Sequence, residues 1–166
     1  MKLIPAALIA LLLAPFLAMP AAARKKEVPP PPPPPAAPLS TSVDGLPIGA
    51  LPKQDLGSGQ CAAFLWTRTP ARALVAMISA NPALFRYAPA GVVTDLARTT
   101  MVGDAKFGLS PQASDASSDT SIAVDLTIEE RGDLKDGAAV PAGTISITQS
   151  GADTLIVPVA GIIGCG

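Results

Sequence analysis

The sequence contains no histidine, only two cysteines and few aromatic residues: one Trp, one Tyr and four Phe among 166 residues. Without histidine, the chain has no Ser–His–Asp or Cys–His catalytic pair and no imidazole base near neutral pH. Cys61 and Cys165 lie too far apart for a Cys-x-x-Cys redox motif, and a zinc site would need further sulfur or imidazole ligands. We therefore expect neither thiol catalysis nor a cofactor.

Acidic side chains are the remaining candidates for catalysis. Glu129 and Glu130 are adjacent, so on a strand they point to opposite faces of the sheet. Only the fold could bring two of Asp95, Asp104 and Asp125 together as the carboxylate pair of a glycan hydrolase. Because most acids lie on a solvated surface, we expect a protein that is not an enzyme. A carboxylate-based glycan hydrolase is the less favoured alternative.

Two short segments have the composition of ligand-binding loops but not their spacing. Residues 115–121 are rich in acids and hydroxyls, yet they lack the alternating Asp positions, central Gly and final Glu of a calcium loop. We expect a flexible loop there. Residues 57–59 form a Gly-x-Gly without the third glycine of a dinucleotide-binding motif, which predicts a bend. Acidic residues outnumber basic ones after residue 54, so we expect no nucleic-acid partner.

The N-terminus has the three parts of a secretory signal peptide. Lys2 precedes an uncharged apolar run over residues 3–23, which ends in three small residues. We expect a signal peptide at residues 1–23, cleavage after Ala23, and a mature protein in the periplasm or outside the cell. The alternative is an uncleaved inner-membrane anchor, because the run is long enough to span a bilayer. Three prolines in the run argue against one continuous helix. We expect the protein to contact the membrane only if the signal peptide is not cleaved.

Residues 24–54 are expected to form a disordered, proline-rich linker. Seven consecutive prolines at residues 29–35 favour polyproline II, a semi-rigid spacer of about 3.1 Å per residue. The alternative is that the proline tract is a ligand for proline-binding modules, but such modules are mostly intracellular. Residues 39–54 show no periodicity and contain several Gly and Pro residues, although this segment could also lie along the domain as an extended strap.

Alternation of apolar and polar residues dominates the domain at residues 55–166. Residues 122–128 alternate as in a strand with one wet face. Residues 144–148 and 155–159 repeat this pattern on either side of a turn at 150–153, which predicts a hairpin.

Two further strands are expected at residues 61–67 and 92–101. Residues 71–80 fit either a short helix or a strand, and we favour the strand because turn signals recur nearby at hairpin intervals. Several short strands with frequent turns predict an all-β fold, either a small antiparallel β-sandwich or a barrel.

The shortage of aromatic residues means that Leu, Ile, Val and Ala must build the core, with Trp66 as its expected anchor. Cys61 and Cys165 stand at the two ends of the domain. In an exported protein we expect them to form a disulfide, because oxidising compartments preserve such bonds. Closing so long a loop stabilises the fold by about 4.7 kcal/mol in the chain-entropy model.

Three motifs resemble those of a group of small exported bacterial proteins. They are the opening Cys-x-x-x-Leu-Trp-Thr at residues 61–67, the Gly-Ala-x-Val-Pro-x-Gly at 137–143 and the ending Gly-x-x-Gly-Cys at 161–165. The resemblance spans the domain but implies no activity, and it carries no functional residue to this chain.

The sequence as a whole predicts an exported envelope protein of Gram-negative type with a binding or structural domain that is not catalytic. The expected partner is an envelope protein or a cell-wall polymer. The alternative binding role is inhibition of an envelope-directed hydrolase, because a compact disulfide-tied β domain displays its loops rigidly.

Export generates the first testable prediction. Intact-mass analysis of the protein from its producing cell should give a chain that begins at Arg24, because the small residues before it suit signal cleavage. A chain that still begins at Met1 and fractionates with the membrane would contradict cleavage and support the anchor.

Overall fold

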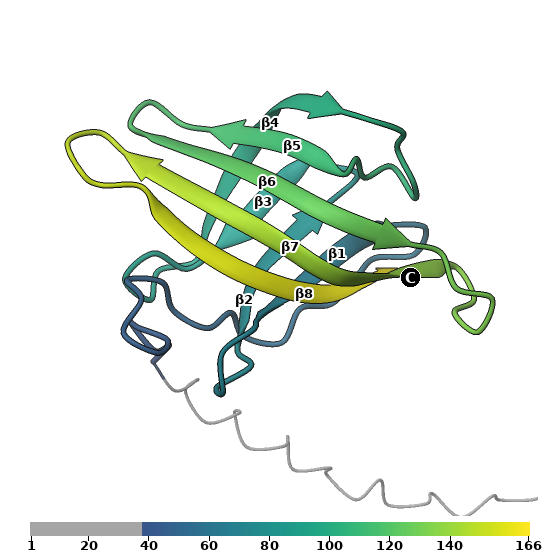
Figure 1. Ribbon diagram of the computed structural model, residues 1–166, viewed down its shortest axis with the longest axis horizontal. Coiled ribbons are helices and arrows are strands. Elements are labelled where there is room, and N and C mark those ends of the chain that lie inside the picture. The colour runs from purple at the N-terminus through teal and green to yellow at the C-terminus, as the bar shows by residue number, and fades with distance from the viewer. Residues whose placement is uncertain (1–37) are drawn as a thin grey trace, which may run out of the picture. The chain divides into compact units, whose positions relative to one another are not determined.

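The computed structural model describes residues 38–166, which fold into a closed antiparallel barrel of eight strands without a helix. Each strand pairs with its neighbours in sequence, and β1 pairs with β8 to close the barrel (Figure 1). The strands are β1 (Cys61–Thr67), β2 (Leu74–Ser79), β3 (Leu84–Tyr87), β4 (Thr94–Val102), β5 (Gln112–Ala116), β6 (Thr120–Glu129), β7 (Gly137–Gln149) and β8 (Leu155–Cys165). The expected all-β antiparallel fold is therefore confirmed, as a barrel rather than a sandwich.

Several expectations from the sequence coincide with single strands. The ambiguous segment at residues 71–80 contains β2, so the strand was the right choice over the helix. The long strands β7 and β8 form the expected hairpin. The expected signal peptide at residues 1–23 and the proline tract at 29–35 lie outside the described residues.

Side chains alternate between the interior and the exterior of the barrel. In β6, Ile122, Val124 and Leu126 are buried, whereas the intervening Ala123 and Asp125 are exposed. In β6 this period of two separates an apolar face from a polar face and sets which residues enter the core.

Apolar side chains fill the barrel from end to end. Phe85, Leu65 and Ile145 are fully buried in a cluster to which every strand except β5 contributes. Ile48, which forms a bridge with Pro89 in the β3–β4 loop, joins this cluster at one end. Leu109 joins it from the β4–β5 loop, which lies at the other end in an up-and-down barrel. The interior is thus a packed apolar core.

The pairing of β1 with β8 places the two cysteines directly opposite each other. Cys61 and Cys165 form the expected disulfide, with their Cα atoms 4.1 Å apart. Such a short separation is typical of a non-hydrogen-bonded pair in an antiparallel ladder. Gly161 permits the close approach of the two strands farther along, because a Cβ atom there would lie 1.9 Å from the carbonyl oxygen of Phe64.

Trp66 lies on the outside of the barrel, so the prediction that it anchors the core is wrong. Leu65 points inward and is fully buried, and alternation directs Phe64 and Trp66 outward. The rings of these two residues lie 6.5 Å apart between centroids, and Trp66 is half-buried. The largest fully buried side chain is instead Phe85.

The expected linker boundary at residue 54 also needs correction, because residues 38–60 form a strap on the barrel (Figure 1, dark blue). Val43 and Ile48 are buried in the barrel core. Leu51 is buried in a second cluster, with Met77 of β2, on the outer side of the strands. Backbone hydrogen bonds from Gly49 to Ala88 and from Leu51 to Leu74 hold the strap in place. The folded unit therefore begins well before Asp55.

Residues 115–121 are not the flexible loop that their composition suggested. Asp115 and Ala116 belong to β5, Asp115 is fully buried, and only residues 117–119 connect β5 to β6. Asp115 is therefore a core residue, whose partner is described below.

The strap generates the second prediction. Ile48→Ala should lower the free energy of unfolding by about 2–5 kcal/mol, because it removes methyl and methylene groups from a packed core. Lys53→Ala, on an exposed part of the strap, should change it by less than about 0.5 kcal/mol. Urea denaturation measures both values. A chain starting at Asp55 that is as stable as one starting at Pro38 would show that the strap does not contribute to the fold.

Candidate functional site

Arg98 and Asp115 form a buried ion pair between β4 and β5. The two residues are directly opposite in the ladder, and the Arg98 Nε atom lies 3.0 Å from Asp115 Oδ1. Their side chains are 5% and 0% exposed. Both guanidinium Nη atoms and Asp115 Oδ2 lack a hydrogen-bond partner within residues 38–166. Burial raises the pKa of the Asp115 carboxyl, although Arg98 opposes this change.

This pair is incompletely satisfied, so its net contribution to stability is small. Removing charges from water is costly. A protein with a buried ion pair is therefore rarely more stable than one with apolar side chains of similar volume at the same positions. Losing one partner alone is different, because it leaves an uncompensated charge in the core. The pair thus favours the register in which Arg98 of β4 lies opposite Asp115 of β5. It does not provide an accessible reactive group, because both side chains are buried.

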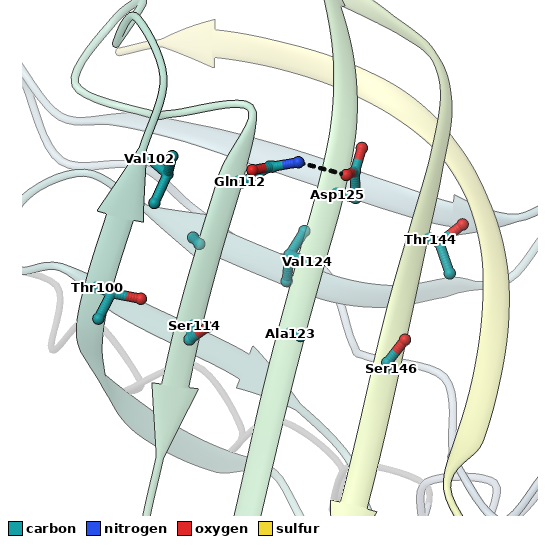
Figure 2. Close-up of a pocket in the computed structure, with 10 residues that line it drawn as sticks. Thr100, Val102, Gln112, Ser114, Ala123, Val124, Asp125, Thr144 and Ser146 are labelled. Carbon is teal, nitrogen blue, oxygen red and sulfur yellow. Dashed lines mark hydrogen bonds between the residues drawn. The ribbon is translucent and has the colours of Figure 1, made fainter.

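A shallow polar groove crosses the outer surface of β4, β5, β6 and β7. It has a volume of about 320 Å³. Figure 2 shows the Gln112 amide donating a 2.8 Å hydrogen bond to the Asp125 carboxylate. Much of the remaining lining consists of small hydroxyl side chains, namely Thr100, Ser114, Thr144 and Ser146.

The β4–β7 groove contains a single carboxylate, so the acids considered from the sequence do not meet there. Asp125 lies in the groove, whereas Asp95 lies near the start of β4. Arg86 donates two 2.7 Å hydrogen bonds to Asp95 and lowers the pKa of that carboxyl. Asp104 lies in the β4–β5 loop. The groove therefore lacks the second carboxylate that glycoside hydrolysis requires.

A second, larger groove lies on the outer surface where β1 meets β8. Its volume is about 670 Å³, within the range of small-molecule sites. Trp66 stands opposite the small Ala160, and Phe64 stands opposite Ile162, which is 48% exposed. The strap covers the apolar outer surface nearer β2, so Trp66 and Ile162 mark the part that it leaves open.

Two arginines of the β1–β2 loop line the same β1–β8 groove. The backbone N–H of Arg68 donates a hydrogen bond to the carbonyl of Pro158 in β8. Arg72 ends a turn in which its backbone N–H donates to the backbone carbonyl of Thr69. The buried Thr67 hydroxyl accepts a hydrogen bond from the backbone N–H of Ala73 and donates its own proton to the Thr69 hydroxyl oxygen, 2.8 Å away. These contacts fix the backbone of the loop, from which the exposed side chains of Arg68 and Arg72 project.

The strap is connected to this loop. The Thr69 hydroxyl donates a hydrogen bond to the Asp44 carboxylate. Neither Arg68 nor Arg72 forms an ion pair within the described part of the chain, whereas Arg86, Arg98, Lys106 and Arg131 each do. The β1–β8 groove therefore combines an indole, an exposed aliphatic side chain and two cations that are available to a ligand.

Sequence reasoning missed both the buried pair and the two groove arginines. The run 112–116 contains only small and polar residues, so its alternation carries no apolar signal. Arg68 and Arg72 flank Thr69-Pro70, a dipeptide that does predict a turn or a helix start. Only the pairing of β1 with β8 shows that these arginines lie beside Ile162.

The buried pair generates the third prediction. Asp115→Ala or Arg98→Ala should lower the free energy of unfolding by about 3–5 kcal/mol, because each leaves one buried charge. The double variant Arg98→Met/Asp115→Val should be more stable than either single variant. Arg86→Ala, in a partly exposed pair, should cost about 1 kcal/mol or less. Urea denaturation of these variants checks all of these values.

The pH dependence of the same variants tests the pKa of Asp115. The folded protein binds this proton more tightly than the unfolded chain, so the contribution of Asp115 to stability is greatest below its unfolded pKa. It should decline as the pH rises through the raised folded pKa. The stability of the wild type relative to the double variant should therefore fall with rising pH over that window. A relative stability that rises with pH would contradict the direction of the shift.

Comparison with known proteins leaves the function to be argued from these residues. No protein-family model matches the chain, no curated protein matches its sequence, and no solved structure matches its fold. Among residues 38–166, no helix is long and apolar enough to cross a membrane. The same residues contain no group of three or more Cys, Asp or Glu side chains arranged to hold a metal. The resemblance to small exported bacterial proteins stays a prediction.

Proposed function

We propose that the chain is an exported envelope protein whose barrel binds a partner through its outer surface and catalyses no reaction. The observation that carries this proposal is the β1–β8 groove, in which Trp66 and Ile162 form an accessible apolar surface beside two arginines. Trp and Arg are among the side chains that most often dominate binding energy at protein interfaces. A partner that covers the groove would remove its apolar surface from water.

A location outside the cytoplasm is supported by the disulfide between Cys61 and Cys165. Disulfides of this structural kind persist in oxidising compartments and are rare in the cytosol. The expected signal peptide agrees with this location and remains part of the proposal, as does the periplasmic or extracellular destination.

Binding is better supported than carboxylate catalysis. Asp125 has no second acid in its groove, and Asp95 is neutralised by Arg86. The β1–β8 groove contains no carboxylate. Its indole and guanidinium groups suit recognition, because they supply contact area and charge-assisted hydrogen bonds rather than a general acid and base.

The fourth prediction tests the groove as the partner surface. The immobilised protein should capture a component of envelope extract, and Trp66→Ala and Ile162→Ser should each reduce that capture at least about tenfold, as expected for central interface residues. Val102→Ser is the matched control, because Val102 is an exposed aliphatic residue on β4. Quantitative mass spectrometry of the eluates measures capture, and thermal melting confirms that each variant is folded.

Equal capture by wild type and all three variants, or no capture by wild type, would contradict the proposal. If the captured component is a hydrolase whose activity falls on addition of the protein, the partner surface serves inhibition. Turnover of a glycan by the protein alone, abolished by Asp125→Asn, would instead support the hydrolase alternative.

A further inference from the structure

We propose that the β1–β8 groove binds an acidic peptide segment of a partner protein. In this arrangement, carboxylates of the segment pair with Arg68 and Arg72, and a neighbouring apolar side chain packs on Trp66 and Ile162. The inference rests on the proposed function and specifies the chemistry of the partner. It adds a ligand class and two specificity-determining residues to the groove.

Charge is the first argument for an acidic ligand. Acidic residues outnumber basic ones in residues 55–166, yet this groove is lined by two arginines and no acid. Neither arginine forms an ion pair within residues 38–166. The nearby Asp44 carboxylate accepts a hydrogen bond from Thr69 instead. Because a guanidinium matches a carboxylate in a two-point hydrogen-bonded geometry, carboxylates are favoured ligands here.

Shape and polarity are the second argument. Trp66 is half-buried, Ile162 is 48% exposed, and the small residues Ala160 and Gly161 separate Ile162 from the loop along β8. This combination of an apolar floor and a cationic rim fits a chain in which acidic and aliphatic side chains are close together. A peptide supplies both on one backbone.

Longer polyanions fit this groove less well than a short acidic peptide. Acidic residues are in excess in the rest of the domain, and their charge repels an extended polyanion. Nucleic-acid binding would also need a clustered basic face. Anionic membranes are ordinarily recognised by clusters of roughly four to eight basic residues. Two arginines in one groove are better matched to one or two carboxylates.

The test uses a phage-displayed library of random dodecapeptides as the probe. The library is panned against the intact purified chain and against Arg68→Gln/Arg72→Gln. Peptides enriched by the wild type should carry acids beside aliphatic residues, and the double variant should not enrich them. Arg131→Gln/Lys135→Gln is the matched control, because it removes the same charge from the exposed β6–β7 loop. Thermal melting verifies that all three proteins are folded.

The single tryptophan of the chain makes the second measurement specific for the groove. Synthetic enriched peptides should change the emission of Trp66 on titration. Their affinity should fall about tenfold or more in Arg68→Gln/Arg72→Gln, the effect expected on losing hydrogen bonds to charged groups. Their affinity should change less than about twofold in the loop control, because the β6–β7 loop lies at the opposite end of the barrel from the β1–β2 loop and salt screens distant charges. Amidated analogues, in which Gln and Asn replace the acids, should also bind at least about tenfold more weakly.

Enrichment without an excess of acids, or acidic peptides that bind both double variants equally, would overturn the inference. It would also be overturned if oligogalacturonate or phosphatidylglycerol vesicles changed Trp66 emission in an arginine-dependent way while no peptide did. If envelope capture stays sensitive to Trp66→Ala while acidic peptides fail, the proposed partner surface stands and only its acidic ligand is wrong.

Discussion

The pairing of β1 with β8 is the constraint on which the rest of the structure depends. An antiparallel sheet of eight strands without a covering helix leaves two open edges unless its first and last strands meet. Here they meet over seven paired positions, from Cys61 opposite Cys165 to Thr67 opposite Val159. The disulfide joins the strands at one end, and Gly161 lets their backbones approach farther along. The same pairing creates the groove on the outer surface.

A closed barrel with few aromatic residues has to fill its interior with aliphatic side chains. The strands alone do not complete this core, because Ile48 of the strap and Leu109 of the β4–β5 loop both enter it. The strap also covers the outer cluster around Met77. The strap leaves uncovered the part of the outer surface around Trp66 and Ile162.

The two outer grooves differ in the chemistry that they present. The β4–β7 groove has hydroxyls, one amide and one carboxylate, and it lacks both an aromatic side chain and a cation. The β1–β8 groove has an indole, an aliphatic surface and two guanidinium groups on a loop fixed by Thr67 and Thr69. This difference is the physical basis for assigning partner recognition to the second groove.

Local patterns in the sequence determined most of the strands, since alternation and turn residues depend only on neighbours along the chain. They predicted the strand at β6, the hairpin of β7 and β8, and the disulfide between the terminal strands. Local patterns were insufficient for β5, whose small and polar residues carry no apolar period, and for the strap, whose few apolar residues have no regular spacing.

Only the tertiary structure decided where individual side chains of the candidate site lie. Trp66 was expected inside because it is large and apolar, but its register next to the inward Leu65 places it outside. Asp115 was expected in solvent because it is charged, but pairing with Arg98 places it in the core. Composition and alternation determined that a β domain forms and which residues could pair. The closure of the barrel decided which face each residue occupies, because that depends on contacts between strands far apart in sequence.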